Sequence, residues 1–137
     1  MISKEFYLKQ IVEQFAKLVT QVEILKGDTY ILGVNPPVRT SGDLFDASVI
    51  TIKTELNEIN RKCCIIANRH IHISKEERKK YNLTKDKYKI KINTDKGGII
   101  DNVYIKESDN YNFELHLDRD DANAFLLKDN DLVEIIE

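Results

Sequence analysis

The feature that most constrains the fold of this chain is an internal repeat in its C-terminal half. Residues 70–83 align without a gap with residues 114–127, at a spacing of 44 residues. Each copy has a strand ending in a histidine and an aliphatic residue, and then a Ser or Asp suited to cap a helix. An acidic residue follows three positions later, as in a capping box. One supersecondary unit used twice predicts an approximate two-fold axis.

The repeat also predicts the fold class, which is mainly β with short helices. Strand-like runs surround the two copies, with Gly-rich or Asn-rich turns between them. Two strand–helix–strand units suggest a single small closed β-barrel, because closure removes exposed sheet edges. The pattern is similar to the double-psi barrels, in which a helix is followed by a short turn and a strand. The predicted strands are 63–73, 87–93, 99–106, 112–117 and 132–136.

The sequence pattern of the N-terminal half predicts a helix and a rigid loop, not a copy of the repeat. Residues 3–22 have apolar side chains at three- and four-residue spacing and predict an amphipathic helix. This helix either packs on the domain or docks on a partner or shell as an encapsulation signal. Prolines and glycines at 33–43 predict a rigid loop with Arg39 near its centre. We therefore expect three parts, which are an N-terminal helix and turn (1–28), a loop, strand and linker (29–60), and a metal-binding β-barrel (61–137).

Composition excludes several function classes. No apolar run approaches the ~20 residues of a membrane span, so we expect neither a membrane protein nor signal-peptide secretion. The formal net charge of −2 over 137 residues gives no basic footprint for nucleic acid. Cys63 and Cys64 are adjacent and form no disulfide framework, which favours a cytoplasmic location.

The chain has only three histidines, and all of them lie in the repeat. His70 and His72 share one face of a strand, and the repeat places His116 at the matching strand end. If a two-fold axis brings these ends together, three imidazoles form a divalent-metal site with one open position. The simpler alternative for each histidine is an ordinary hydrogen-bonded or surface residue. Cys64 lies roughly 20 Å back along the strand, and we expect it in the core instead.

Four segments, in order, resemble one known family. The sequence LGVNPPVRTSGDL at 32–44 resembles the loop of the propanediol-utilization type (PduL-type) phosphate acyltransferases. The sequence ANRHIHIS at 67–74 looks like the R-H-x-H strand of that family. Residues 101–103 and 114–124 match its remaining motifs. The resemblance runs from about residue 30 to the end of the sequence.

The resemblance implies an activity and a metal. Family members convert an acyl-CoA and phosphate to an acyl phosphate and CoA, with two zinc ions between two similar barrels. His70, His72 and His116 match the three-histidine ligand set of the second barrel, which implies one zinc per chain. The first barrel of the family carries another R-H-x-H strand, a glutamate ligand and a catalytic arginine. This sequence matches none of these, so we expect the first barrel to be missing.

The mechanism that the resemblance implies is direct attack of phosphate on the thioester carbonyl. Arg39 and Arg69 are the candidate catalytic residues, because a guanidinium pairs with phosphate in a bidentate way. Arg39 and Ser41 are also candidates for CoA binding. Structural hydrogen bonding is the alternative role for both arginines.

Two hypotheses of different classes follow. The first is a shortened phosphate acyltransferase that acts on acyl-CoA, CoA and phosphate, either alone, as a homodimer or with a complementing barrel. A bacterial microcompartment is a candidate location for such an enzyme. The second is a non-catalytic zinc- and CoA-binding half-domain that serves as a partner subunit or is a remnant.

Overall fold

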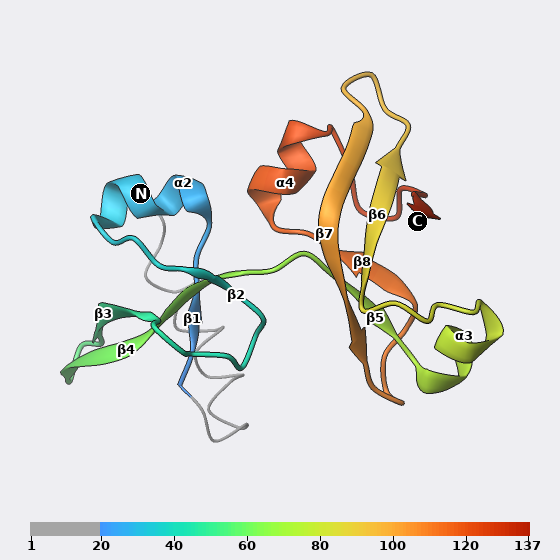
Figure 1. Ribbon diagram of the computed structural model, residues 1–137. Helices are drawn as coiled ribbons and strands as arrows, with labels where there is room; N and C mark the ends of the chain where they lie inside the picture. Colours follow the sequence, from blue (N-terminus) through green and yellow to red (C-terminus); the bar gives the residue numbers. More distant parts are fainter. Residues whose placement is uncertain (1–19) are drawn as a thin grey trace. The chain divides into compact units, whose positions relative to one another are not determined.

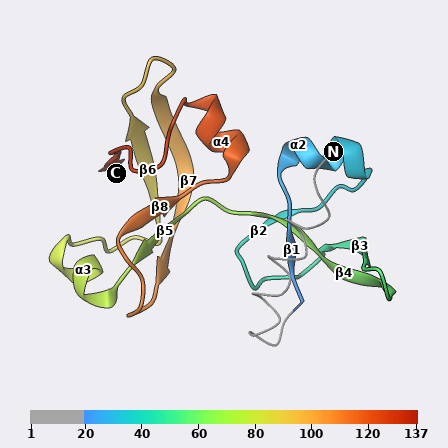
Figure 2. The same cartoon turned by 180° about the vertical axis from the view of Figure 1, so that it is seen from behind.

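The computed structural model describes residues 20–137 and is mainly β with short helices (Figures 1 and 2). The chain divides into two compact units, Met1–Ala67 and Asn68–Glu137, which are described separately below. Whether the three parts expected from the sequence are domains stays a prediction. Within residues 20–137, no helix has the length and apolar character needed to cross a membrane.

The first unit is built around one long strand, β4 (Glu58–Ala67). β4 pairs antiparallel with β3 (Ser48–Lys53) and parallel with β1 (Val22–Glu23) and β2 (Val38–Arg39). Its apolar half, Cys63–Ile66, is buried on both faces of the strand. A continuous apolar run of this kind is typical of a strand that is covered on both sides.

The two cysteines lie in the core of this unit, as the sequence analysis expected for Cys64. They pack with Val22 and Ile24 among the buried residues. Burial raises the pKa of the Cys64 thiol to about 11, and the neighbouring Cys63 adds to the shift. The thiol therefore stays protonated at neutral pH, whereas a metal ligand must be a thiolate.

Helix α2 (Lys26–Leu32) forms where the sequence analysis expected a turn. Its end is marked by Gly33, which has a φ of 66° in the left-handed region that glycine adopts without strain. In the loop after it, Val38 and Arg39 form the short strand β2, which the prolines were expected to prevent. Such a strand is possible because Pro36 and Pro37 precede it and leave its own N–H groups intact.

The second unit is a curled five-stranded sheet, half of a barrel (Figure 1). The strands lie in the order β8 (Glu114–His116), β5 (His70–Ile73), β7 (Gly98–Glu107), β6 (Lys87–Ile92) and β9 (Glu134–Ile136). β5 runs parallel to β7, and the other three neighbouring pairs are antiparallel. β8 and β9 form the two ends of this order, so these five strands alone make an open half-barrel.

The predicted repeat is confirmed down to single hydrogen bonds. Helices α3 (Lys75–Lys80) and α4 (Arg119–Ala124) start 44 residues apart. Ser74 caps the first and Asp118 caps the second, each accepting a hydrogen bond from the backbone N–H three residues later. The backbone hydrogen bonds of each helix and of the turn after it recur at the same spacing. The acidic residues at 118–121 thus include the expected helix cap.

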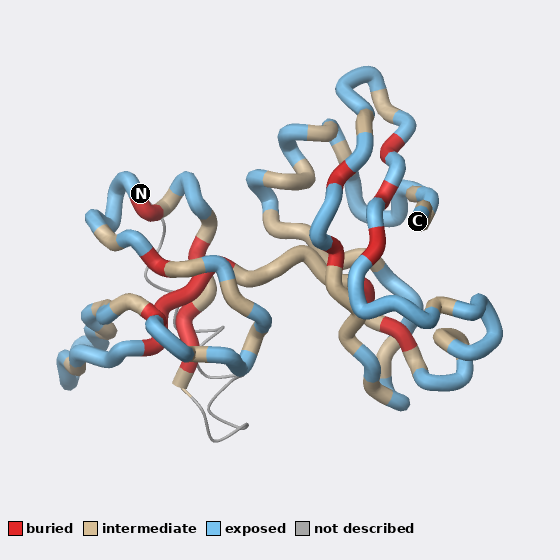
Figure 3. Tube along the Cα trace, viewed as in Figure 1, coloured by how far each residue is buried: buried red, intermediate tan, exposed pale blue. Residues whose placement is uncertain are grey.

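The core of the second unit is formed by buried residues of β5, β6 and β7 (Figure 3). Alternate residues of β5 and β6 face it, and the intervening residues face outward, as the period of a strand requires. The β6–β7 hairpin turns at Gly97, as predicted. A Cβ on Gly97 would lie 2.2 Å from the carbonyl oxygen of Ile92, so only glycine fits. The fully buried members are Ile71, Ile73, Ile90, Ile92, Ile100 and Val103.

Three sequence-based boundaries need correction. Residues 3–19 of the predicted helix lie outside the described residues, and its last residue, Val22, belongs to β1. The single strand predicted over 63–73 is two strands, because the chain leaves β4 at Ala67 and begins β5 at His70 in the other sheet. The linker expected at the end of the 29–60 part includes the start of β4, at Glu58, which pairs with β3 across a short turn.

Candidate metal centre

The three histidines come together on one face of the β5–β8 ladder. His70 lies directly opposite His116, and His72 lies opposite Glu114. Alternate residues of a strand point to the same face, so these four side chains share it. The sequence spacing predicted this convergence, and the antiparallel register produces it.

The geometry of the imidazoles fits a divalent metal ion. One ring nitrogen from each of His70, His72 and His116 lies within 4.8 Å of the other two. The Nε2 atoms of His70 and His72 are 3.1 Å apart. Zinc–nitrogen bonds of 2.0–2.1 Å in a tetrahedron place ligand nitrogens about 3.3 Å from each other. Imidazole is also a ligand that zinc accepts readily, so the three histidines could hold such an ion.

A backbone contact fixes the orientation of His70. Its Nδ1 lies 2.9 Å from the carbonyl oxygen of Asn68, to which the Nδ1–H donates. With the proton on Nδ1, the lone pair of the ring lies on Nε2, the atom 3.1 Å from Nε2 of His72. Metal-binding histidines commonly use their second nitrogen in this way.

His72 is held in its neutral form. Its ring stacks on Tyr111 with centroids 3.9 Å apart and planes 8° from parallel. Burial lowers the pKa of His72 to about 4, and charges on His116, His70 and Lys106 add to the shift. A neutral imidazole is the form that binds a metal, so the site needs no proton release from His72 at neutral pH.

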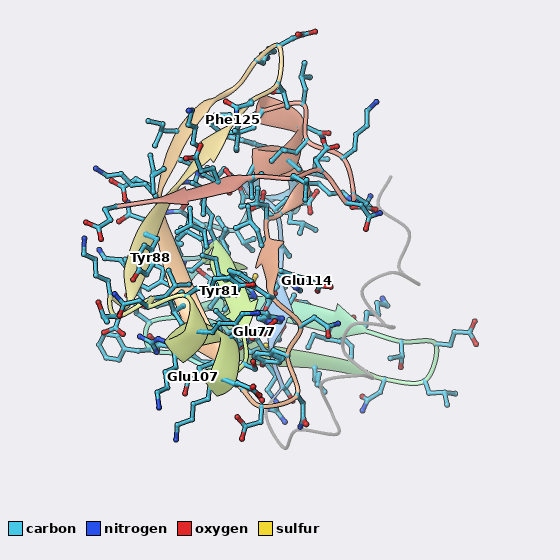
Figure 4. All side chains as sticks on the ribbon, turned by 90° about the vertical axis from the view of Figure 1, so that its right-hand side faces the viewer. Glu77, Tyr81, Tyr88, Glu107, Glu114 and Phe125 are labelled. Atoms are coloured by element: carbon cyan, nitrogen blue, oxygen red, sulfur yellow. The ribbon has the colours of Figure 1, made fainter. Side chains whose placement is uncertain are left out.

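Glu114 brings a carboxylate to the same face, and sequence reasoning missed it (Figure 4). Its Oε2 lies 3.4 Å from Nε2 of His116. The repeat contained the signal, because Glu114 occupies the position of His70 in the second copy. A carboxylate here can orient an imidazole or balance the charge of a cation.

Arg69 precedes His70 but is fully engaged with other groups. Its Nε and Nη2 donate to the two carboxylate oxygens of Asp121, at 2.6 and 2.7 Å. Its Nη1 donates to the carbonyl oxygen of Asp101 at 3.1 Å. The hydrogen bond to Asp121 raises the pKa of Arg69, against the opposing effect of burial. The pair joins the strand that carries His70 to the helix that follows His116.

Arg39 and Ser41 belong to the first unit, where side-chain hydrogen bonds hold the loop at 33–43 in place. Nη2 of Arg39 lies 2.7 Å from each carboxylate oxygen of Asp46. Gln21, which sequence reasoning also missed, is a buried polar residue that donates to Ser41 Oγ at 2.9 Å. The backbone N–H of Gly42 donates to Oε1 of Gln21 at 2.6 Å.

The fold and the site define a class of protein, a mainly β chain with a three-histidine metal-site geometry at the ends of repeated strands. A family model described as phosphate propanoyltransferase matches residues 12–128, and the chain therefore belongs to that family. The PduL-type resemblance that the motifs indicated is confirmed.

Individual relatives agree with this assignment. The chain is 40% identical over 122 residues to the phosphate propanoyltransferase of Thermotoga maritima, covering 86% of this chain and 58% of the relative. It is 34% identical over 108 residues to that of Limosilactobacillus reuteri, covering 77% and 50%. The Shewanella putrefaciens protein is 40% identical over 108 residues, with 77% and 51% covered. The chain thus spans about half the length of the curated relatives it matches.

Proposed function

We propose that this chain takes part in phosphate-dependent acyl transfer, converting an acyl-CoA and phosphate to an acyl phosphate and CoA. The observation that carries the proposal is the three-histidine cluster in a member of the phosphate propanoyltransferase family. The sequence motifs at 32–44 and 67–74 also resemble those of the family.

His70, His72 and His116 would hold one zinc ion per chain. A bound zinc ion acts as a Lewis acid that polarises a carbonyl or phosphoryl oxygen. The role of the three imidazoles is to fix the coordination geometry and leave one position open to a reactant. Neutral His72 and the oriented His70 support that role.

In the proposed reaction, a phosphate oxygen attacks the thioester carbonyl carbon and the carbon–sulfur bond breaks. The sulfur leaves as the thiolate of CoA and takes up a proton from solvent. Arg39 is the candidate for holding phosphate or the CoA diphosphate, with Ser41 beside it in the loop. Its bidentate bond to the Asp46 carboxylate is the geometry that a guanidinium also offers to phosphate. Binding would require that bond to open.

For Arg69 we propose an indirect part. All three of its described donor contacts go to Asp121 and to the backbone of Asp101, so a substrate contact would break a bidentate pair. Its partners favour a role in positioning the strand ends, with phosphate contact as the second possibility.

The length of the chain bears on the assembly. Because the chain spans about half of its relatives, we propose that activity requires a homodimer or a complementing barrel. The closed double-psi barrel expected from the repeat is part of this proposal, since the five described strands leave two ends open.

The direct test is an assay of CoA release. The purified chain, supplied with zinc, is mixed with propionyl-CoA or acetyl-CoA, and free thiol is measured with and without phosphate. We expect phosphate-dependent release that is lost in His72→Ala and strongly reduced in Arg39→Ala. Lys75→Ala, on the exposed side of α3, serves as the matched control and should keep full activity.

The alternative function is a zinc-binding module without catalysis, which the half-length match favours. In that case His72→Ala abolishes zinc uptake, measured by metal analysis, while no oligomeric form of the unmodified chain releases CoA. Absence of turnover in every purified assembly would rule out the acyltransferase proposal for this chain alone. Retention of zinc by His72→Ala would rule out the site itself.

A further inference from the structure

We propose that Tyr111 is a positioning residue of the metal centre, which holds the ring of His72 at the angle needed to bind zinc. The proposal rests on the three-histidine zinc site of the proposed function, and it does not depend on acyl transfer. Its basis is the contact between the two rings and the way in which the chain holds Tyr111 in place.

The rings of Tyr111 and His72 lie face to face. Their centroids are 3.9 Å apart and their planes are 8° from parallel. The contacts of His72 with the other two histidines are tilted, by 45° for His70 and by 39° for His116. The plane of the His72 ring therefore follows the plane of Tyr111 and not that of another ligand.

The backbone alone does not set the ring plane of a histidine. Rotation about χ2 of an imidazole is broad, so the plane depends on the groups around the ring. His70 has an outer partner, because its Nδ1 donates to the carbonyl oxygen of Asn68. The hydrogen-bond contact of the His72 ring is with Nε2 of His70, which is itself a candidate ligand. Tyr111 gives His72 a partner outside the ligand set.

The turn that carries Tyr111 is joined to the strand that carries His72. The backbone N–H of Ser108 donates to the carbonyl oxygen of Ile73 at 3.1 Å. The backbone N–H of Tyr111 donates to the carbonyl oxygen of Ser108 at 3.0 Å. Ile73 directly follows His72 in β5, so these two hydrogen bonds fix the start of the tyrosine side chain relative to the histidine.

The stack lies outside the aliphatic core of the second unit. Alternate residues of a strand face opposite sides, so His72 points away from the face that Ile71 and Ile73 give to the core. Tyr111 is half-buried and does not belong to the described residues that pack against this core. Continued at a spacing of 44 residues, the repeat places Ala67 at the position of Tyr111. Neither the core nor the repeated framework requires an aromatic ring there, which favours a role in the metal centre.

Stacking leaves the metal-binding edge of His72 available. The lone pair of an imidazole nitrogen lies in the plane of the ring, whereas Tyr111 covers a face of the ring. The ring can therefore bind zinc while it stays stacked. A ring held at one angle keeps its lone pair pointed at the ion, and removal of an outer partner of a ligand typically weakens metal binding about 10- to 100-fold.

Two substitutions of Tyr111 separate the ring from the hydroxyl, and isothermal titration of the full chain with zinc compares them. We expect Tyr111→Leu to weaken zinc binding about tenfold and Tyr111→Phe, which keeps the ring, to stay within about twofold of the unmodified chain. Tyr81→Leu is the matched control. Tyr81 contacts another ring of the same unit, that of Phe113, with centroids 5.3 Å apart, so its loss should leave zinc affinity unchanged.

Cobalt(II) bound in place of zinc distinguishes positioning from a contribution to stability. The visible absorption of the bound cobalt reports the coordination geometry of the loaded site. At saturating cobalt, Tyr111→Leu should change this spectrum, and Tyr111→Phe should restore that of the unmodified chain. A role in stability alone would lower the midpoint of urea denaturation and leave the spectrum of the loaded site unchanged.

Proton NMR of the unmodified chain tests the stack without any substitution. Nuclear Overhauser contacts between the ring protons of Tyr111 and His72 should be present without zinc and persist when zinc binds. The proposal is overturned if these contacts vanish on zinc binding, if Tyr111→Leu keeps the unmodified zinc affinity and cobalt spectrum, or if Tyr111→Phe behaves as Tyr111→Leu does. If the metal measurements agree with expectation but no CoA is released, the acyl-transfer proposal fails and this one holds.

Discussion

The surroundings of His72 affect both its readiness to bind a cation and the stability of the fold in acid. It is the histidine opposite Glu114, stacked on Tyr111, and burial holds its pKa at about 4. An imidazole that is neutral at physiological pH is ready to bind a cation without competition from a proton. The same burial makes the protein sensitive to acid, because the unfolded chain binds a proton at this residue more readily than the folded chain does.

The sign of the pH effect follows from the lowered pKa. Between pH 6.5 and about 4, His72 is protonated in the unfolded state and neutral in the folded state. The free energy of unfolding of the metal-free protein should therefore fall as the pH is lowered through this window. Below about pH 4, the contribution of His72 should no longer change with pH. Urea denaturation in the presence of EDTA at several pH values from 7 to 4 measures the slope.

The matched variant isolates this residue. His72→Gln should show a shallower loss of stability between pH 6.5 and 4, whereas Lys75→Gln, on exposed α3, should follow the unmodified protein. Equal slopes in all three proteins would show that His72 does not titrate as its surroundings require.

The elements around the site are tied together by one ion pair. Arg69 stands just before β5, and Asp121 lies in the first turn of α4, the helix that follows β8. Their bidentate bond links the two strand ends that carry the histidines. The corresponding residue of α3, Glu77, bonds instead to its own helix cap, Ser74. The two copies of the repeat thus use the same position for different purposes.

This difference gives a prediction with an internal control. Asp121→Asn should weaken zinc binding about tenfold, because it loosens the link between the two strand ends while its backbone N–H can still donate to Asp118. Glu77→Gln changes the equivalent position of α3, away from Arg69, and should leave zinc affinity unchanged. Isothermal titration with zinc measures both. Unmodified affinity in Asp121→Asn would assign the ion pair to stability alone.

The whole molecule consists of two units with separate cores, and all three histidines belong to the second. A ligand that binds only the folded state stabilises the region that it needs folded. At a free zinc concentration of 100 times Kd, this effect is about 2.7 kcal/mol. We expect zinc to slow hydrogen exchange in residues 68–137, above all in β5 and β8.

The first unit supplies the comparison for that measurement. The β3–β4 hairpin and β1 should keep their exchange rates when zinc is added, if the two units open independently. Equal protection of both units would show instead that they unfold as one cooperative body. The result bears on any assembly with a complementing barrel, because it shows which of the two units zinc binding stabilises.

The sequence by itself determined much of the second unit. The 44-residue spacing, the caps at Ser74 and Asp118 and the place of the three histidines are local patterns, and local patterns survive in the fold. The family motifs were likewise readable, because they depend on residue identity alone. Helix α2 and the division of the 63–73 strand were missed, since short elements depend on the sheet they join more than on propensity.

Only the tertiary structure shows which residues that are far apart in the sequence come into contact. Only the register of β5 against β8 places Glu114 opposite His72, and only the packing of α4 gives Arg69 its partner in Asp121. The sequence repeat also did not determine whether the sheet closes into a barrel. A repeat indicates that two units are related, but hydrogen bonds between strands determine whether the sheet closes. Among residues 20–137, they pair β8 only with β5 and β9 only with β6.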